Sequence, residues 1–403
     1  MPDLADIRTA RERIQDAIVC TPSVPALALR DQLPCALHLK LENLQRTGSF
    51  KDRGALNRLL DLTSEERSRG IVTASAGNHA QAVAYHGSRL GITVEVVMPE
   101  HTPLIKVTNT RRFGAGVRFH GSTLSDAMTE ARRLEAEEGR VLVHPFDDER
   151  VIAGQGTIGL ELLEQVPDLT AVVVPIGGGG LIGGIAVAIK EQRPEVRIYG
   201  VEAAAAASAL ASRRGGRIIP IETSDTIADG IAIKRVGERT FPLIERYVDD
   251  IVAVDEHQIA GAVHWLLERQ KVVAEGAGAV PLAALAAGML PLQEHDVVVM
   301  VLSGGNIDIN LIERIVDRGL VADGRLARLA VTVPDRPGHL ARVTQLVAEA
   351  GANVLDVAHH RAFADISVRD VEIIMHVETR GRDHVIALIA LLERHGFHVR
   401  EDL

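Results

Sequence analysis

"AVVVPIGGGGLIGGIAVAI", residues 171–189, decides the fold class of this chain because it allows only two interpretations. The run carries no charged residue and is about long enough to cross a bilayer. Its six glycines and Pro175 instead fit a buried strand, a glycine-rich turn and a helix. We therefore expect a strand–turn–helix unit here and no membrane partner.

Other apolar runs extend this pattern along most of the chain. Runs rich in Val and Ile occur at 70–74, 94–99, 171–176, 197–202 and 297–305. Helices are predicted between and around them at 3–18, 54–62, 78–90, 123–138, 181–191, 256–269 and 277–288. Near-continuous apolar strands separated by helices predict an α/β fold whose parallel sheet is covered on both faces. Ligands then bind at the carboxyl ends of the strands.

The pattern changes near residue 320. The remaining residues predict strand 327–333, helix 338–350, strands 353–361 and 367–378, helix 382–395 and strand 396–400. This βαββαβ order is ferredoxin-like. It indicates a second domain and not an extension of the parallel sheet.

Composition limits the partners of the protein. The 403 residues carry a formal net charge of −10, which argues against nucleic acid or an anionic membrane as the main partner. A small-molecule ligand is expected instead. Cys20 and Cys35 are too few for a disulfide framework, and the N-terminal residues lack a secretory apolar segment, so a cytoplasmic location is predicted.

The glycine run has two chemical interpretations and one structural one. Gly177, Gly178, Gly179 and Gly180 lie between a predicted strand and a predicted helix that begins near Leu181, where backbone N–H groups can bind a phosphate. Close packing of small residues explains the same glycines without a ligand. G-x-G-x-x-G spacing, followed by Glu202 at the end of the next strand, also keeps a dinucleotide dehydrogenase open.

Three further loops carry polar groups. The loop "SAGNH" (75–79) is either a binding site for a carboxylate at a helix N-terminus or an ordinary helix cap. The loop "SGGN" (303–306), considered alone, is a turn that ends a strand. "SFKDRGALN" (49–57) raises the question of whether Lys51 is a solvated charge or a reactive amine. Together the four loops are expected to face one crevice.

The complete set of motifs resembles a known family. It comprises SFKDRGA (49–55), SAGNHAQ (75–81), PIGGGGL (175–181), TIADGIA (226–232), EGAGA (275–279) and SGGN (303–306). These motifs resemble the fold-type II pyridoxal-phosphate enzymes, and among them the threonine and serine dehydratases. The resemblance implies a tryptophan synthase β-like fold with two parallel-sheet subdomains over residues 1–320, the smaller at about 52–147.

The resemblance also implies roles for individual residues. Lys51 would bind pyridoxal 5'-phosphate covalently and then act as a base, which makes it catalytic together with Ser75. The remaining assignments are Phe50 as an apolar wall, Gly177, Gly178, Gly179, Gly180 and Leu181 around the phosphate, Asn78 at the ring hydroxyl, Ser303 at the pyridine nitrogen, and Ser75, Asn78 and His79 at the substrate carboxylate.

The activity implied by the resemblance is dehydration and deamination of L-threonine, or of L-serine, to a 2-oxo acid and ammonia, as in isoleucine biosynthesis. Serine racemase, hydroxyaspartate ammonia-lyase and β-replacing synthases share the fold and stay open, as do the dehydrogenase and a catalytically silent amino-acid sensor. No metal is predicted. Glu202 is the one weak candidate ligand, because alanines and Ser208 follow it where related racemases have a second acid.

The tail from 328 to 403 resembles an ACT domain, joined by a linker at 321–327. Such a domain commonly binds an amino-acid effector at the turn after its first strand, where this chain has Asp335, Arg336 and Gly338. A dimerisation module without a ligand is the alternative. A homo-oligomer, dimer or tetramer, is expected in either case.

Overall fold

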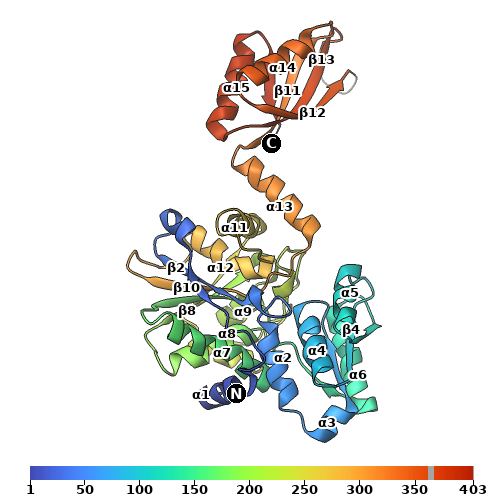
Figure 1. Cartoon of the computed structure of the whole chain (residues 1–403), viewed down its shortest axis with the longest axis vertical. Helices are drawn as coiled ribbons and strands as arrows, with labels where there is room; N and C mark the ends of the chain where they lie inside the picture. The colour runs from blue at the N-terminus through green and yellow to red at the C-terminus, as the bar shows by residue number, and fades with distance from the viewer. Residues whose placement is uncertain (362–366, 403) are drawn as a thin grey trace. The chain divides into compact units, whose positions relative to one another are not determined.

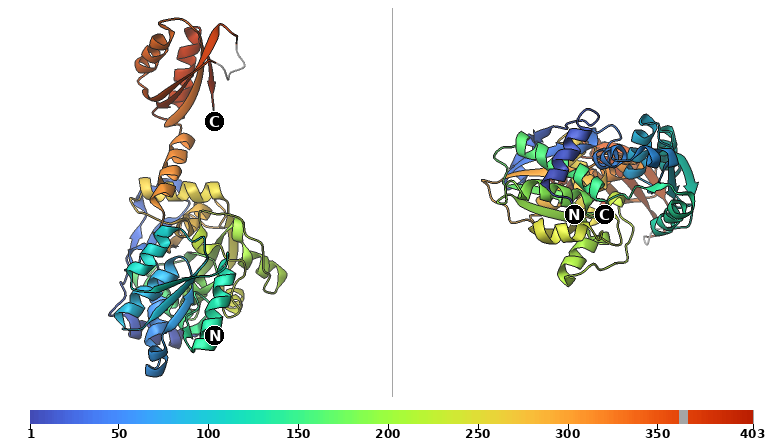
Figure 2. Two further views of the ribbon diagram at one scale, coloured as in Figure 1. Left: turned by 90° about the vertical axis from the view of Figure 1, so that its right-hand side faces the viewer. Right: turned by 90° about the horizontal axis from the view of Figure 1, so that it is seen from below.

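The computed structural model describes residues 1–361 and 367–402 of the chain (Figures 1 and 2). The chain forms two compact units, Met1–Ile307 and Asp308–Leu403. Helix α13 (Ile309–Ala322) lies in the second unit, whereas the sequence interpretation gave most of its residues to the catalytic domain. The predicted domain bounds stay a prediction.

The main sheet of the first unit has the strand order β1-β2-β10-β7-β8-β9. Its strands are β1 (Ser23–Pro25), β2 (Ala36–Leu41), β7 (Ala171–Pro175), β8 (Arg197–Ala203), β9 (Asp250–Val254) and β10 (Val297–Leu302). All neighbours pair in parallel except β1 with β2. Every residue of β7 is buried, as expected for a parallel strand that is covered on both faces.

Helices cover both faces of this sheet: in Figure 1, α11 and α12 lie on one side, and α1, α7 and α8 on the other. The helices are α1 (Leu4–Ile14), α7 (Glu149–Gln165), α8 (Gly180–Lys190), α9 (Ser208–Gly215), α10 (Thr240–Tyr247), α11 (Glu256–Glu268) and α12 (Gly276–Ala286), with the 3-10 turns η1 (Leu27–Gln32), η2 (Glu42–Leu44), η3 (Ala204–Ala206) and η4 (Asp229–Ile231). The opening motif therefore forms β7, a turn and α8. Among the described residues, no helix combines the length and apolarity needed to cross a membrane.

A second parallel sheet with the strand order β5-β4-β3-β6 forms the smaller part of this unit. Its elements are β3 (Ile71–Ala74), β4 (Val94–Met98), β5 (Gly116–Phe119), β6 (Val141–Leu142), α2 (Lys51–Leu60), α3 (Ser64–Arg69), α4 (Asn78–Arg89), α5 (Leu104–Arg112) and α6 (Leu124–Glu138). Leu59, Val83 and Val96 share one buried core, which packs α2 and α4 on the sheet. The predicted arrangement of two parallel sheets is confirmed.

Several helices, among them α5, α9, α10 and α13, were not predicted, and two differences concern the helices next to the site. Helix α2 begins at Lys51 and not at residue 54, because buried polar side chains hold its first turn. Helix α7 was not predicted, since its glycines lower helix propensity. A Cβ atom on Gly154 would lie 2.7 Å from Gly54 Cα, and one on Gly156 would lie 2.8 Å from the Gly184 carbonyl oxygen. These glycines thus let α7 pack closely on α2 and α8.

The second unit has the predicted βαββαβ order. After α13 it contains β11 (Leu326–Pro334), α14 (His339–Glu349), β12 (Asn353–His360), β13 (Asp370–Glu378), α15 (Arg382–Arg394) and β14 (His398–Glu401). The strands form an antiparallel sheet in the order β12-β13-β11-β14. Leu329, Val331 and Val333 alternate along β11 and are buried in the core of this unit.

A buried ionic network joins α2 to the main sheet. Arg53 and Lys40 are 1% and 0% exposed. Arg53 pairs with Glu42 at 2.8 Å and with Glu161 at 2.6 Å, and Lys40 pairs with the other oxygen of Glu161 at 2.5 Å. Two cations and two anions therefore neutralise one another inside the protein. The network connects β2, η2, α2 and α7.

We predict that Arg53→Met destabilises the protein by about 3–5 kcal/mol, because it leaves the charges of Glu42 and Glu161 buried without their arginine. The matched control is Arg11→Met, which removes an exposed pair with Glu164 and changes stability by about 0–1 kcal/mol. Urea unfolding followed by circular dichroism measures both. Equal effects of the two substitutions would contradict a structural role for the network.

Candidate active site

Lys51 is the first residue of α2, and its amine is held inside the protein. Its Nζ donates a hydrogen bond to the Pro145 carbonyl at 2.7 Å and lies 5.0 Å from the centroid of the Phe50 ring. Burial lowers the pKa of Lys51 to about 8, although the nearby Glu275 carboxylate acts in the opposite direction. A substantial fraction of this amine is therefore neutral near pH 8.

The loop that carries Lys51 pairs with the loop after β10. The Phe50 N–H donates to the Ser303 carbonyl at 2.9 Å, and Ser49 forms an antiparallel bridge with Gly304. The Gly305 N–H donates to the Gly48 carbonyl at 3.0 Å. Two of the four predicted loops are thus adjacent, and this pairing places Ser303 beside the start of α2.

Asn78, at the start of α4, connects this pair of loops to α12. Its Nδ2 donates to both carboxylate oxygens of Glu275, at 2.8 and 3.0 Å. Its Oδ1 accepts a hydrogen bond from Asn306 Nδ2 at 2.8 Å, and Asn306 also donates to the Thr47 carbonyl at 2.7 Å. Burial raises the pKa of Glu275 to about 7, an effect that the Asn78 hydrogen bond opposes.

The other two residues of the predicted carboxylate site make contacts of their own. Ser75 Oγ accepts a hydrogen bond from the Gly77 N–H at 3.3 Å. The His79 ring is buried, with Nε2 at 3.2 Å from the Val143 carbonyl. Burial, and secondarily the charge of Lys51, lowers the pKa of His79 to about 3, so its imidazole is neutral. A role of these side chains toward a substrate carboxylate stays a prediction.

The glycine loop presents backbone N–H groups that have no acceptor within the described chain. From Gly177 to Ile182, none of the backbone N–H groups donates to another described residue. Gly179 has a φ of +90°, which favours glycine, and α8 begins directly after it. The Gly178 carbonyl accepts hydrogen bonds from Thr240 Oγ1 at 2.6 Å and from the Gly237 N–H at 3.2 Å. The loop is therefore fixed while its donors remain available.

Glu202, the weak metal candidate and the acid of the dinucleotide interpretation, is buried at the end of β8. Its two carboxylate oxygens accept hydrogen bonds from the backbone N–H groups of Ala209, at 2.9 Å, and Leu210, at 2.8 Å. Burial raises the pKa of Glu202 to about 7, against the effect of these bonds. This carboxylate therefore accepts hydrogen bonds from backbone N–H groups in the first turn of α9.

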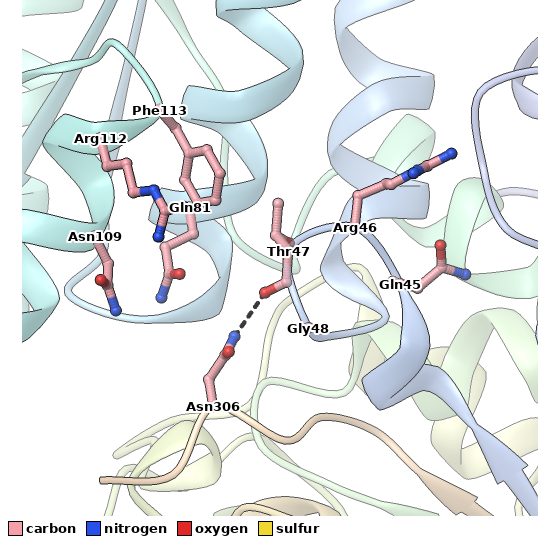
Figure 3. A pocket seen from close by; sticks show the side chains of 9 residues that line it. All are labelled: Gln45, Arg46, Thr47, Gly48, Gln81, Asn109, Arg112, Phe113 and Asn306. Carbon is pink, nitrogen blue, oxygen red and sulfur yellow. Dashed lines mark hydrogen bonds between the residues drawn. The ribbon is translucent and has the colours of Figure 1, made fainter. Parts of the chain in front are cut away.

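A polar pocket of about 350 Å³ adjoins the loop 45–48 (Figure 3). It is lined by Gln45, Arg46, Thr47, Gly48, Gln81, Asn109, Arg112, Phe113 and Asn306. Figure 3 shows Asn306 reaching the Thr47 carbonyl at one side, with Gln81, Asn109 and Arg112 on the other. Lys51 does not line this pocket, which lies beside the predicted nucleophile and does not contain it.

Two family models match the sequence. The model described as "Pyridoxal-phosphate dependent enzyme" matches residues 14–304, well over half of the chain, and the model described as "ACT domain" matches residues 327–394. The chain belongs to the pyridoxal-phosphate-dependent enzymes. This membership overturns the dinucleotide-dehydrogenase interpretation of the glycine run.

Several members of this enzyme family are similar over most of their length. The L-threonine ammonia-lyase of Thermotoga maritima is 46% identical over 99% of both chains, and that of Geobacter sulfurreducens is 46% identical over 98% of both. Among solved structures, threonine deaminase isoform 2 from Solanum lycopersicum is 38% identical with a TM-score of 0.74, covering 78% of this chain and 91% of that one. Serine racemase from Dictyostelium discoideum is 37% identical with a TM-score of 0.72, covering 76% and 99%.

The residues of this pyridoxal-phosphate-dependent enzyme fit its cofactor. A phosphate group needs several donors in one place, and the unpaired N–H groups from Gly177 to Ile182 supply them at a helix N-terminus. An aldehyde needs an amine that is neutral part of the time, which burial provides at Lys51. The close-packing explanation of the glycines is also partly correct, because a Cβ atom on Gly178 would lie 2.2 Å from the Phe146 ring.

Sequence reasoning gave no role to several residues that shape the site. Glu275 and Asn306 lie inside quoted motifs, yet their contact with Asn78 joins positions 197 and 228 residues apart. Pro145, which accepts a hydrogen bond from Lys51, belongs to no quoted motif. The one sequence feature that could have indicated a role for Glu275 is its position, as a polar residue directly before a glycine-rich helix.

We predict that Gly178→Ala weakens binding of pyridoxal phosphate by about tenfold or more, because the new methyl group overlaps the Phe146 ring and displaces the loop. The matched control is Gly183→Ala in the adjoining helix α8, where the nearest atom to the new Cβ is a leucine side-chain carbon at 3.3 Å. Cofactor titration by absorbance measures both. Unchanged affinity in Gly178→Ala would remove this loop from the cofactor site.

Proposed function

We propose that this enzyme is an L-threonine ammonia-lyase, which converts L-threonine into 2-oxobutanoate and ammonia. The observation that carries the proposal is the 46% identity to the Thermotoga maritima L-threonine ammonia-lyase over 99% of both chains, the ACT domain included. The placement of Lys51 supports it. A cytoplasmic, isoleucine-forming role and a dimeric or tetrameric assembly remain predictions.

Lys51 acts as the base in this proposal. Pyridoxal phosphate supplies an electron sink for the negative charge that develops at the substrate Cα. The lysine amine takes the proton from Cα, which requires its neutral form, and the lowered pKa of about 8 makes that form available. The Pro145 carbonyl accepts one of the amine hydrogens and so restrains the orientation of the amine.

The surrounding loops orient the two ligands. The N–H groups from Gly177 to Ile182 would hold the cofactor phosphate, and Ser303 would be the partner of the pyridine nitrogen. The substrate carboxylate binds at the start of α4, where Ser75 and Asn78 lie and the helix N-terminus favours negative charge. The reaction is balanced because the water lost with the β-hydroxyl is regained when the amine is released as ammonia.

We predict that Lys51→Ala abolishes release of 2-oxobutanoate from L-threonine while the thermal unfolding temperature stays near that of the parent, because proton transfer needs this amine. The matched control is Lys234→Ala, which removes an exposed pair with Glu222 and leaves turnover unchanged. Keto-acid release and D-serine formation from L-serine are measured in parallel. D-serine as the main product of the parent enzyme would favour a racemase instead.

The tail is proposed to bind an amino-acid effector at the turn from Asp335 to Gly338. Gly338 has a φ of +98°, precedes α14, and has no other atom within 4 Å of a Cβ position. There is therefore open space at Gly338 for a carboxylate, which the N-terminus of α14 favours. Asp335 pairs with Arg361 at 3.1 Å, which fixes one side of the turn.

We predict that Gly338→Val removes the response of the enzyme to isoleucine, valine or threonine as effector, because the side chain covers the start of α14. The control is Gly396→Val, also at positive φ with open surroundings in the same unit, so that both variants carry similar backbone strain. Calorimetric binding and the substrate dependence of the rate report the response. Parental binding in Gly338→Val would place the effector elsewhere.

A further inference from the structure

The turn from His144 to Asp147, here called the HPFD turn, contacts both the amine and the phosphate loop. The Pro145 carbonyl accepts the hydrogen bond of Lys51 Nζ at 2.7 Å. One residue later, the Phe146 ring lies against Gly178, close enough that a Cβ atom there would lie 2.2–2.4 Å from three ring carbons. The four residues of the HPFD turn therefore contact both Lys51 and the glycine loop.

The far end of the HPFD turn is anchored to the residues that directly precede α10. The Asp147 carboxylate accepts hydrogen bonds from the backbone N–H groups of Glu238, at 3.1 Å, and Arg239, at 2.8 Å. Directly beside them, the Gly237 N–H and Thr240 Oγ1 donate to the Gly178 carbonyl. The turn and the glycine loop are thus attached to the same segment of chain.

His144 holds the turn in this shape. Its Nδ1 accepts hydrogen bonds from the backbone N–H groups of Asp147, at 2.9 Å, and Phe146, at 3.3 Å. Its ring also meets the Phe146 ring edge to face, with centroids 4.7 Å apart and an interplanar angle of 88°. One imidazole therefore fixes both the backbone that carries the Pro145 carbonyl and the ring that covers Gly178.

The imidazole must be unprotonated at Nδ1 to accept these bonds. Burial lowers the pKa of His144 to about 4, with Asp147 acting against it and Arg132, Lys51 and Arg239 acting with it. The ring is consequently a neutral acceptor under ordinary conditions, and a side-chain carbonyl oxygen in the same place can replace it. Asn has this property, because its side chain bonds backbone N–H groups two and three residues further along the chain.

We propose that His144 is a positioning residue, which sets the separation between the Lys51 amine and the phosphate-binding glycine loop by holding the HPFD turn. The inference depends on the proposed function for one point, the reaction that Lys51 carries out. It concerns the cofactor site itself, so that cofactor affinity tests it separately from threonine turnover. No step of the chemistry is assigned to the imidazole.

The experiment compares full-length His144→Ala, His144→Asn and His101→Ala with the parent. His101 is exposed in the same subdomain, and its side chain has no hydrogen bond or ion pair to any described residue. The dissociation constant of pyridoxal phosphate, kcat/KM for L-threonine and the thermal unfolding temperature are measured for each. Phe146→Leu is added as a second route to a displaced turn, in case His144→Ala fails to fold.

We expect His144→Ala and Phe146→Leu to weaken cofactor binding and to lower kcat/KM by about tenfold or more, since small displacements of reacting groups are costly. His144→Asn restores both to within about threefold of the parent, and His101→Ala changes neither. Parental cofactor affinity in His144→Ala, or His144→Asn no better than His144→Ala, overturns the proposal. If His144→Ala weakens cofactor binding but the parent enzyme does not consume threonine, the proposed function is refuted and the positioning role stays intact.

Discussion

The neutral ionic network around Arg53 is the interaction on which the site depends. Arg53 lies two residues after Lys51, and its guanidinium is fully paired with Glu42 and Glu161 inside the protein. Because charges buried without partners are strongly unfavourable, any shift of α2 that separates Arg53 from these carboxylates is costly. Lys51, two residues earlier on the same helix, is held by the same contacts.

The site is assembled from backbone pairing as much as from side chains. Lys51 and Ser303 are adjacent because the strand-like segments Ser49–Phe50 and Ser303–Gly304 bond to one another. Asn78 then joins this pair to α12 through Glu275. Each of these contacts crosses between distant parts of the chain, and the groups that make them lie in loops and at the first residues of helices.

Sequence patterns predicted the elements whose conformation depends on residues close to them in the chain. The start of α8 and the order of elements in the tail were predicted from glycine positions and apolar periodicity, and both agree with the structure within a few residues. The first turn of α2 and all of α7 were missed, because their conformation depends on partners far along the sequence. The burial of Lys51 and the contact of Asn78 with Glu275 could not be derived from spacing; the family resemblance supplied the role of the lysine and no pattern supplied that of Glu275.

The unpaired N–H groups of the glycine loop have a consequence for the lifetime of the protein. Gly178, Gly179 and Gly180 are buried, so a phosphate that accepts hydrogen bonds from their N–H groups would stabilise the folded first unit. A ligand that binds only the folded state shifts the unfolding equilibrium more strongly as its concentration rises. Supply of the cofactor would then affect how much of this enzyme escapes proteolysis, as well as how much of it is active.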